Sequence, residues 1–211
     1  MPEFALAFDM YGTLVEPAKE PQEVAAAWRR HQLEITWLVS LLERYEDFGA
    51  VTAYALDAAL AESGIELPEA KRQELLERAR VPRLFEDVPE ALEALASAGL
   101  TMAVFSNGTP RQLETIVHEH GIERYFADLI SVDEVGVYKP APAVYRRAAA
   151  RLGRPIEHVW LVSANPFDVA GAKLAGMRAA KVERSPSFAY GFAPPVDLVV
   201  GSLAELAGGL G

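Results

Sequence analysis

Four short stretches of the sequence carry side chains that could act together on a small anionic substrate. They are residues 9–13, with Asp9, residues 106–108, with Ser106, the pair Lys139 and Pro140, and residues 163–168, with Asp168. A carboxylate can act as a nucleophile or a base, and a lysine beside it can offset its charge. The chain contains no cysteine, which excludes thiolate nucleophiles, thiolate metal sites and disulfides.

The elements around these stretches alternate between strands and helices. Short apolar runs predict buried strands at residues 4–8, 100–105, 158–162 and 178–182, with weaker candidates at 129–132 and 198–200. Amphipathic helices are expected at residues 89–98, 112–120, 141–152 and 168–176, and each ends at or next to a glycine. This alternation predicts an α/β fold with a doubly wound, Rossmann-like parallel sheet.

Ligands of such sheets bind outside the carboxyl ends of the strands. Asp9, Ser106 and Ser163 each follow an expected strand directly, and Lys139 precedes an expected helix. We therefore expect the four stretches to converge at one edge of the sheet.

Residues 16–84 interrupt the alternation. They hold no convincing strand, but helical patterns cover residues 21–45, 49–64 and 68–80. We predict a helical cap subdomain at residues 16–84, inserted after the first strand of an α/β core domain formed by residues 1–15 and 85–211.

Composition narrows the classes of partner. The 211 residues are 51% hydrophobic and carry a formal net charge of −10, which argues against a nucleic-acid-binding protein. An anionic substrate would need positive charge concentrated at its site. There is no signal-peptide pattern and no apolar run of about 18 residues, so we expect a cytoplasmic protein that does not contact the membrane.

Taken together, the four stretches resemble the motifs of the haloacid dehalogenase-like superfamily, in the same order. Within the insert, residues 28–34 and 44–48 resemble the L-2-haloacid dehalogenase branch. The resemblance implies a Rossmann-like core with a helical cap, and a homodimer. It also implies hydrolysis of short 2-haloalkanoic acids to 2-hydroxy acids with inversion, through an ester on Asp9 and without a metal or other cofactor.

The resemblance assigns the first step to residues around the substrate. Asp9 would attack C2, while Ser106 and backbone amides near Tyr11 and Gly12 hold the substrate carboxylate. Arg29 and Asn107 would receive the halide, and Phe167 would form an apolar wall.

The second step would hydrolyse the ester. Asp168 would orient or deprotonate the water, and Lys139 would keep Asp9 ionised. Supporting hydrogen bonds are expected from Thr13, Tyr145, Ser163 and Asn165.

A Mg²⁺-dependent phosphatase of the same fold is the alternative function, and a non-catalytic binding protein is a second one. A phosphatase of this superfamily has an aspartate two positions after the nucleophile, where this chain has Tyr11. It also has a Gly-Asp pair that helps to hold the metal, where this chain has Ser163 and Ala164. Both differences favour the dehalogenase.

Several residues also have simpler interpretations. Asp9 could cap a helix, Tyr145 and Phe167 could be packing residues, and Arg30 could replace Arg29. The branch often has tryptophan in place of Phe167 and a large aromatic in place of Gly49, and the segment between residues 14 and 28 is shorter than usual. Pocket size and chain-length preference are therefore left open.

Overall fold

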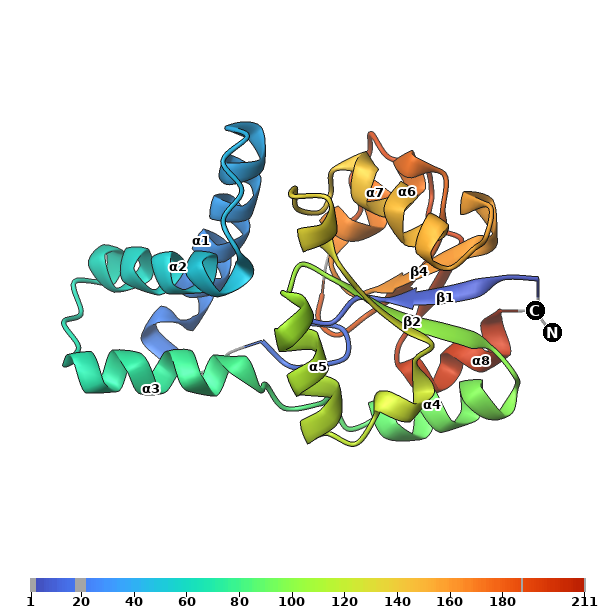
Figure 1. Cartoon of the computed structure of the whole chain (residues 1–211), viewed down its shortest axis with the longest axis horizontal. Helices are drawn as coiled ribbons and strands as arrows, with labels where there is room; N and C mark the ends of the chain where they lie inside the picture. Colours follow the sequence, from blue (N-terminus) through green and yellow to red (C-terminus); the bar gives the residue numbers. More distant parts are fainter. Residues whose placement is uncertain (1–2, 18–21, 187, 211) are drawn as a thin grey trace.

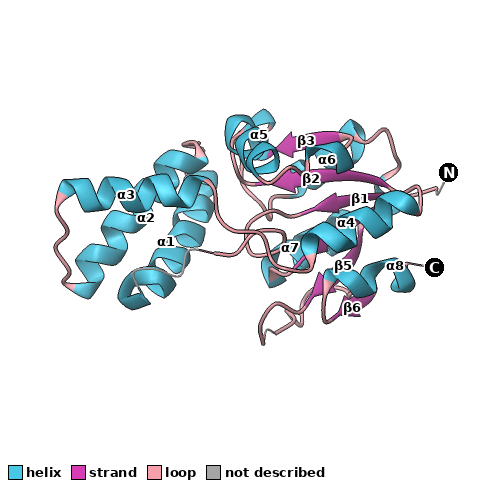
Figure 2. Ribbon diagram, turned by 90° about the horizontal axis from the view of Figure 1, so that it is seen from below, coloured by secondary structure: helices cyan, strands magenta, loops and turns pink. Residues whose placement is uncertain are grey.

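The computed structural model describes residues 3–17, 22–186 and 188–210. Its centre is a six-stranded parallel sheet with the strand order β3-β2-β1-β4-β5-β6. In Figure 2, β3 lies at one edge of this sheet and β6 at the other. The strands are β1 (Ala5–Phe8), β2 (Thr101–Ser106), β3 (Asp128–Ser131), β4 (Val159–Ser163), β5 (Arg178–Val182) and β6 (Leu198–Val200). The predicted α/β class is confirmed.

Helices cover both faces of the sheet. On one face lie α4 (Val88–Ser97), α5 (Pro110–Glu119) and α8 (Leu206–Gly209), and on the other α6 (Pro142–Arg151) and α7 (Pro166–Ala175), as Figure 1 shows. The strands are buried on both faces because their side chains alternate between two apolar clusters. In β1, Leu6 and Phe8 join the first cluster, and Ala7 joins the second.

The remaining long helices form a separate group beside the carboxyl ends of the strands (Figure 1). They are α1 (Gln22–Leu41), α2 (Phe48–Ser63) and α3 (Glu69–Arg80). They pack on one another through Val24, Trp28, Leu56 and Leu75, among others. These helices can therefore bring side chains over the end of the sheet where a ligand would bind.

Two backbone hydrogen bonds join the segments that lead to and from this helical group. The Glu16 amide donates to the Arg83 carbonyl at 2.8 Å, and the Phe85 amide donates to the Leu14 carbonyl at 3.0 Å. The division of the chain into a core and a cap at residues 16 and 84 remains a proposal that this pairing supports.

Local sequence explains where several helices begin. Asp47 caps α2 by accepting hydrogen bonds from the amides of Gly49 and Ala50, and Thr109 forms a capping box with Gln112 before α5. Prolines at the first or second position begin α5, α6 and α7. These starts lie one or two residues from the predicted ones.

The helix predicted for residues 21–45 differs from the structure at its end. Pro21 lies outside the described residues, and α1 ends at Leu41. Glu43 adopts a left-handed conformation with φ of 54°, which stops the helix although no glycine marks the position. Tyr45 therefore lies in the following loop, where its ring contacts that of Tyr138. Among the described residues, no helix has the length and apolar character needed to cross a membrane.

Candidate active site

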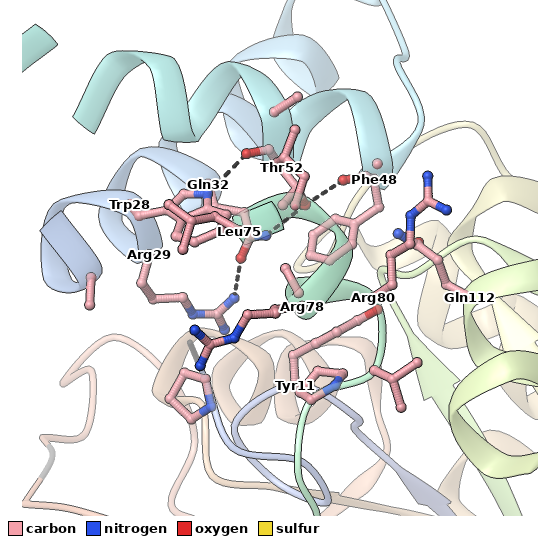
Figure 3. A pocket seen from close by; sticks show the side chains of 18 of the residues that line it. Tyr11, Trp28, Arg29, Gln32, Phe48, Thr52, Leu75, Arg78, Arg80 and Gln112 are labelled. Carbon is pink, nitrogen blue, oxygen red and sulfur yellow. Dashed lines mark hydrogen bonds between the residues drawn. The ribbon is translucent and has the colours of Figure 1, made fainter. Parts of the chain in front are cut away.

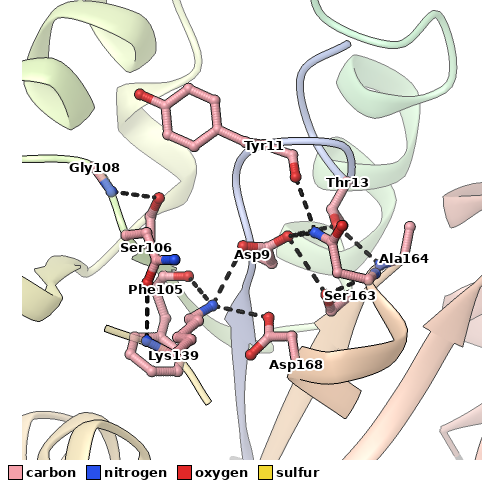
Figure 4. A network of polar contacts seen from close by, with 12 residues as sticks. Asp9, Tyr11, Thr13, Phe105, Ser106, Gly108, Lys139, Ser163, Ala164 and Asp168 are labelled. Atoms are coloured by element: carbon pink, nitrogen blue, oxygen red, sulfur yellow. Dashed lines mark hydrogen bonds and ion pairs between the residues drawn. The ribbon is translucent and has the colours of Figure 1, made fainter. Parts of the chain in front are cut away.

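Three strand ends meet at the centre of the sheet, as predicted. Asp9 follows β1, while Ser106 and Ser163 are the last residues of β2 and β4, the two neighbours of β1. The strand order reverses between β1 and β4, because β2 and β3 lie on one side of β1 and β4, β5 and β6 lie on the other. Such a point of reversal leaves a crevice at the strand ends. Figure 4 shows the polar network that fills it.

The two carboxylate oxygens of Asp9 have different surroundings. Oδ2 accepts hydrogen bonds from Asn165 Nδ2 at 2.7 Å, Thr13 Oγ1 at 2.9 Å and Ser163 Oγ at 3.4 Å. Oδ1 faces the ammonium group of Lys139 at 3.3 Å. The side chain of Asp9 is nearly buried, so these donors fix the orientation of its carboxylate.

Lys139 lies between two buried carboxylates. Its Nζ donates to Asp168 Oδ2 at 2.9 Å and to the Phe105 carbonyl at 2.8 Å, in addition to its contact with Asp9. The ammonium group also lies 4.0 Å from the centre of the Phe105 ring, within the range of a cation–π interaction. The buried charges are therefore paired, as a low-dielectric interior requires.

Asp168 receives a second donor from the opposite side. The Tyr145 hydroxyl donates to its Oδ1 at 2.8 Å. Burial raises the pKa of Asp168 above the usual range of an aspartate, and the positive charge of Lys139 opposes this rise. Burial, followed by the nearby charge of Asp168, raises the pKa of Tyr145, so that its hydroxyl stays protonated and donates.

The loop after Asp9 is held by the loop after β4. Asn165 Nδ2 donates to the Tyr11 carbonyl at 3.0 Å, and the Ala164 amide donates to Thr13 Oγ1 at 2.9 Å. Gly12 has φ of 86°, a conformation that favours glycine, which lets the chain turn next to the Asn165 side chain. The loop of Asp9 is thus fixed by its neighbour.

Ser106 and Asn107 form the wall at the end of β2. Ser106 Oγ accepts a hydrogen bond from the Gly108 amide at 3.1 Å, and Asn107 Oδ1 accepts one from the Lys139 amide at 3.1 Å. Both side chains are buried. The structure therefore places these two residues with Asp9 and Lys139, as expected.

Arg29 reaches the site from α1. Its Nη2 donates to Asn165 Oδ1 at 3.4 Å, and its Nη1 donates to Gln32 Oε1 at 2.8 Å. Burial lowers the pKa of Arg29, and the negative charge of Asp9 opposes this change. Arg30 instead pairs with Glu62 on the exposed surface, so the structure favours Arg29 over Arg30.

A cavity of about 660 Å³ extends from this part of the site between the helical group and the sheet (Figure 3). Tyr11 and Gln112 line it from the sheet part, and Arg29 lines it from α1. Burial raises the pKa of the Tyr11 hydroxyl. Of the predicted site residues, Tyr11 and Arg29 line the cavity, whereas Asp9, Ser106 and Lys139 are not among its lining residues.

Phe167 does not line this cavity. It lies in a second, largely apolar cavity of about 480 Å³, where its ring packs edge-on against Trp37 with 5.6 Å between ring centres. The role of Phe167 as a wall of the substrate pocket therefore stays a prediction.

Sequence reasoning missed the contacts of Arg184, which join the Asp9 loop to Asp87 and which we call the Arg184 clamp. Arg184 Nη2 donates to the Thr13 carbonyl at 2.9 Å, and Nη1 pairs with Asp87 at 2.8 Å. Asp87 also accepts a hydrogen bond from the Leu203 amide at 2.8 Å. No local pattern marks these residues, because Arg184 follows β5 and Asp87 precedes α4, far apart in the sequence.

Within residues 3–17, 22–186 and 188–210, no three histidine, aspartate or glutamate side chains form a group that could hold a metal ion. At the centre of the network, the group between the two carboxylates is the Lys139 ammonium.

Comparisons with known proteins agree on one family. The family of haloacid dehalogenase-like hydrolases matches residues 5–176. Haloacetate dehalogenase H-2 of Moraxella sp. (strain B) is 36% identical over 200 residues, which cover 90% of this chain and 87% of that protein. The (S)-2-haloacid dehalogenase of Pseudomonas sp. (strain YL) is 35% identical and covers 85% of this chain and 82% of its own length.

A solved structure gives the same result. The L-2-haloacid dehalogenase of Xanthobacter autotrophicus with chloropropionic acid covalently bound superposes with a TM-score of 0.88 at 30% identity. The match covers 98% of this chain and 97% of that one.

Proposed function

The chain belongs to the haloacid dehalogenase-like hydrolases, in their L-2-haloacid dehalogenase branch, and we propose that it hydrolyses short (S)-2-haloalkanoic acids to 2-hydroxy acids. The reaction would invert C2 and pass through an ester on Asp9. The observation that carries this proposal is the buried Asp9 carboxylate, oriented by Thr13 and Asn165 and paired with Lys139.

The first step is displacement of the halide by Asp9 Oδ1. We assign the attack to Oδ1 because three donors already occupy Oδ2. The electron pair of Oδ1 forms a bond to C2, and the halide leaves on the opposite side with the electrons of the carbon–halogen bond. Arg29 and Asn107 would stabilise the departing anion.

The substrate carboxylate requires donors of its own. Ser106 and the Tyr11 backbone amide would bind it, whereas the Gly12 amide already donates to the Val15 carbonyl at 2.7 Å. Positive charge from Lys139 would offset the approach of the two anions, the substrate and Asp9.

The second step is attack of water on the Asp9 carboxyl carbon. Asp168 would take a proton from the water, and its raised pKa supports this role because a base must hold the proton it receives. The acyl–oxygen bond then breaks, the 2-hydroxy acid leaves with a proton, and the Asp9 carboxylate is restored. Tyr145 and Ser163 would position Asp168 and Asp9.

The phosphatase alternative is less well supported. A phosphatase must protonate its leaving group, and Tyr11 occupies the position of the required acid. The high pKa of the Tyr11 hydroxyl also makes it a weak acid. A halide needs no proton to leave.

Chloride release from (S)-2-chloropropionate in EDTA is the direct test. We expect turnover without added metal, no turnover by Asp9→Asn, and no hydrolysis of p-nitrophenyl phosphate with Mg²⁺. A single turnover in ¹⁸O-water should give a first product that carries unlabelled oxygen from Asp9. Unchanged chloride release by Asp9→Asn, or activity only on the phosphoester, would refute the proposal.

The homodimer implied by the family resemblance also stays a prediction. Sedimentation velocity across a range of protein concentrations would test it.

A further inference from the structure

The guanidinium group of Arg29 is bonded through both of its terminal nitrogens. Nη1 donates to Gln32 Oε1 at 2.8 Å, and Nη2 donates to Asn165 Oδ1 at 3.4 Å. The bond to Gln32 is the stronger one, because 3.4 Å is longer than a usual hydrogen bond between nitrogen and oxygen. A guanidinium group is planar, so these two bonds set the direction of its remaining N–H groups. Gln32 is therefore the main anchor of Arg29.

The amide group of Gln32 is itself oriented by α2. The Thr52 hydroxyl donates to the Phe48 carbonyl at 2.6 Å, which leaves its oxygen to accept a hydrogen bond. Gln32 Nε2 donates to that oxygen at 2.9 Å. Because the NH₂ group of Gln32 faces Thr52, its carbonyl oxygen faces Arg29, as Figure 3 shows. The direction of each hydrogen bond from Thr52 to Arg29 is thus determined.

The same chain of hydrogen bonds continues to the proposed nucleophile. Asn165 Nδ2 donates to Asp9 Oδ2 at 2.7 Å and to the Tyr11 carbonyl at 3.0 Å. The Oδ1 atom of Asn165 is then the acceptor for Arg29. Hydrogen bonds therefore link Thr52, in the helical group, to Asp9 at the end of β1.

The packing of α1 on α2 has other sources than Gln32. Trp28 Nε1 donates to the Thr52 carbonyl at 2.9 Å, and Val24 and Leu56 belong to the apolar cluster of the helical group. Gln32 itself is partly exposed and lines the cavity of about 660 Å³. Its bond to Arg29, rather than a part in helix packing, is therefore what Gln32 contributes.

A neutral partner suits the proposed role of Arg29. The amide oxygen of Gln32 orients the guanidinium group and leaves its positive charge uncancelled, whereas a carboxylate in its place would form an ion pair. A departing halide gains negative charge in the transition state, and a preorganised cation stabilises that charge. An uncharged acceptor thus gives orientation without competing with the halide.

We propose, on the basis of the proposed function, that Gln32 is a positioning residue for the first step of the reaction. Held by Thr52, it directs the Arg29 guanidinium group towards the departing halide and leaves the charge of that group available. The contribution of Gln32 is then largest for the halide that most needs stabilisation. Chloride is a poorer leaving group than bromide, so loss of Gln32 should affect chloride more.

The test compares (S)-2-chloropropionate with (S)-2-bromopropionate as substrates. Displacement of the halide is irreversible, so kcat/KM for halide release reports the first step and not the hydrolysis of the ester. Gln32→Leu should lower kcat/KM about tenfold for the chloride, as loss of one charge-assisted hydrogen bond allows, and clearly less for the bromide. The ratio of kcat/KM for bromide to that for chloride should therefore rise, while Tm stays close to that of the parent protein.

Thr52 provides an independent pair of variants. Thr52→Val removes the oxygen that accepts from Gln32 and keeps a similar shape, so it should also raise the bromide-to-chloride ratio. Thr52→Ser keeps that oxygen and should retain the ratio of the parent protein. Gln73→Leu is the matched control, because Gln73 also lines the cavity but donates to Glu77 at 2.9 Å. It should leave the ratio unchanged.

Halide release by the parent protein separates the two proposals. If the parent is active but Gln32→Leu leaves both kcat/KM values unchanged, or lowers both by the same factor, the inference about Gln32 is wrong and the dehalogenase remains. A rise in the ratio for Gln73→Leu as large as that for Gln32→Leu would also overturn it. If Gln32→Leu does not fold, equal ratios for Thr52→Val and Thr52→Ser would have the same consequence. If the parent releases neither chloride nor bromide, both proposals fail.

Discussion

Replacement of Lys139 by methionine tests whether one ammonium group holds the site together. Its Nζ lies 3.3 Å from Asp9 Oδ1 and 2.9 Å from Asp168 Oδ2, and the side chain is buried. With an effective dielectric constant of about 20, each contact contributes roughly 5 kcal/mol of attraction. The cost of burying the charges offsets part of this, and breaking a buried ion pair typically costs about 3–5 kcal/mol.

Such a loss is a large fraction of the roughly 5–15 kcal/mol that stabilises a typical protein. For a chain of this size each kcal/mol shifts Tm by about 2–4 °C, so Lys139→Met should lower Tm by roughly 10 °C. Lys173→Met is the matched control, because Lys173 pairs with the partly exposed Asp197 at 2.7 Å. Because Asp197 is partly exposed, solvent screens this pair, which should contribute about 1 kcal/mol, so the control should lose only a few degrees.

The fall in Tm of Lys139→Met should depend on pH in a defined direction. Burial raises the folded-state pKa of Asp168 and Lys139 lowers it, so the pKa should rise further in the variant. A carboxyl whose folded pKa is raised stabilises the fold when it is protonated, and this contribution is lost as pH rises through the folded pKa. The difference in Tm between the parent and Lys139→Met should therefore be largest near pH 8 and should shrink towards the unfolded aspartate pKa of about 3.9.

Thermal unfolding followed by circular dichroism from pH 8 to pH 4.5 measures both effects. Chloride release should fall about 100-fold or more, as expected when one preorganised charge is removed. Equal Tm losses for Lys139→Met and Lys173→Met, or a difference that grows at acid pH, would refute the reasoning.

Three further variants test other contacts. Gly171→Ala should destabilise the protein by about 1–3 kcal/mol in denaturant unfolding despite alanine's helix preference, because the new methyl would collide with the Tyr145 hydroxyl and lie 2.7 Å from Pro140. Gly208→Ala is the control and should show no loss, because a methyl there meets nothing within 4 Å. Asp168→Asn should release one equivalent of chloride rapidly, and further chloride release should then be about 100-fold slower or more, with the Asp9 ester visible by intact-protein mass spectrometry. If no ester accumulates, the role of Asp168 as the base is contradicted. Arg184→Met should cost about 2–4 kcal/mol in urea unfolding, because Asp87 and the Thr13 carbonyl lose a charged donor; an unchanged urea midpoint would show that the clamp is unimportant.

Contacts that depend on sequence order were predictable. The strands follow from short apolar runs, and the carboxyl ends of neighbouring parallel strands must meet, so Asp9, Ser106 and Ser163 could be placed together without coordinates. The roles that these residues play in the reaction remain proposals.

Contacts that depend on packing between distant segments were not predictable in the same way. Arg29 and Arg30 differ by about 100° around α1, so the choice between them depends on how that helix packs against the sheet. Their contacts, to Asn165 and to Glu62, favour Arg29.

The sequence by itself therefore determined the fold class, the order of the motifs and the set of polar residues at the strand ends, because local periodicity and strand topology govern all three. Only the tertiary structure decided that Arg29 of α1 and Tyr11 line one cavity, that Phe167 lies beside Trp37 and that Arg184 binds the Asp9 loop. Each of these joins segments whose separation in the chain carries no periodic signal, and their positions follow from packing of the whole molecule.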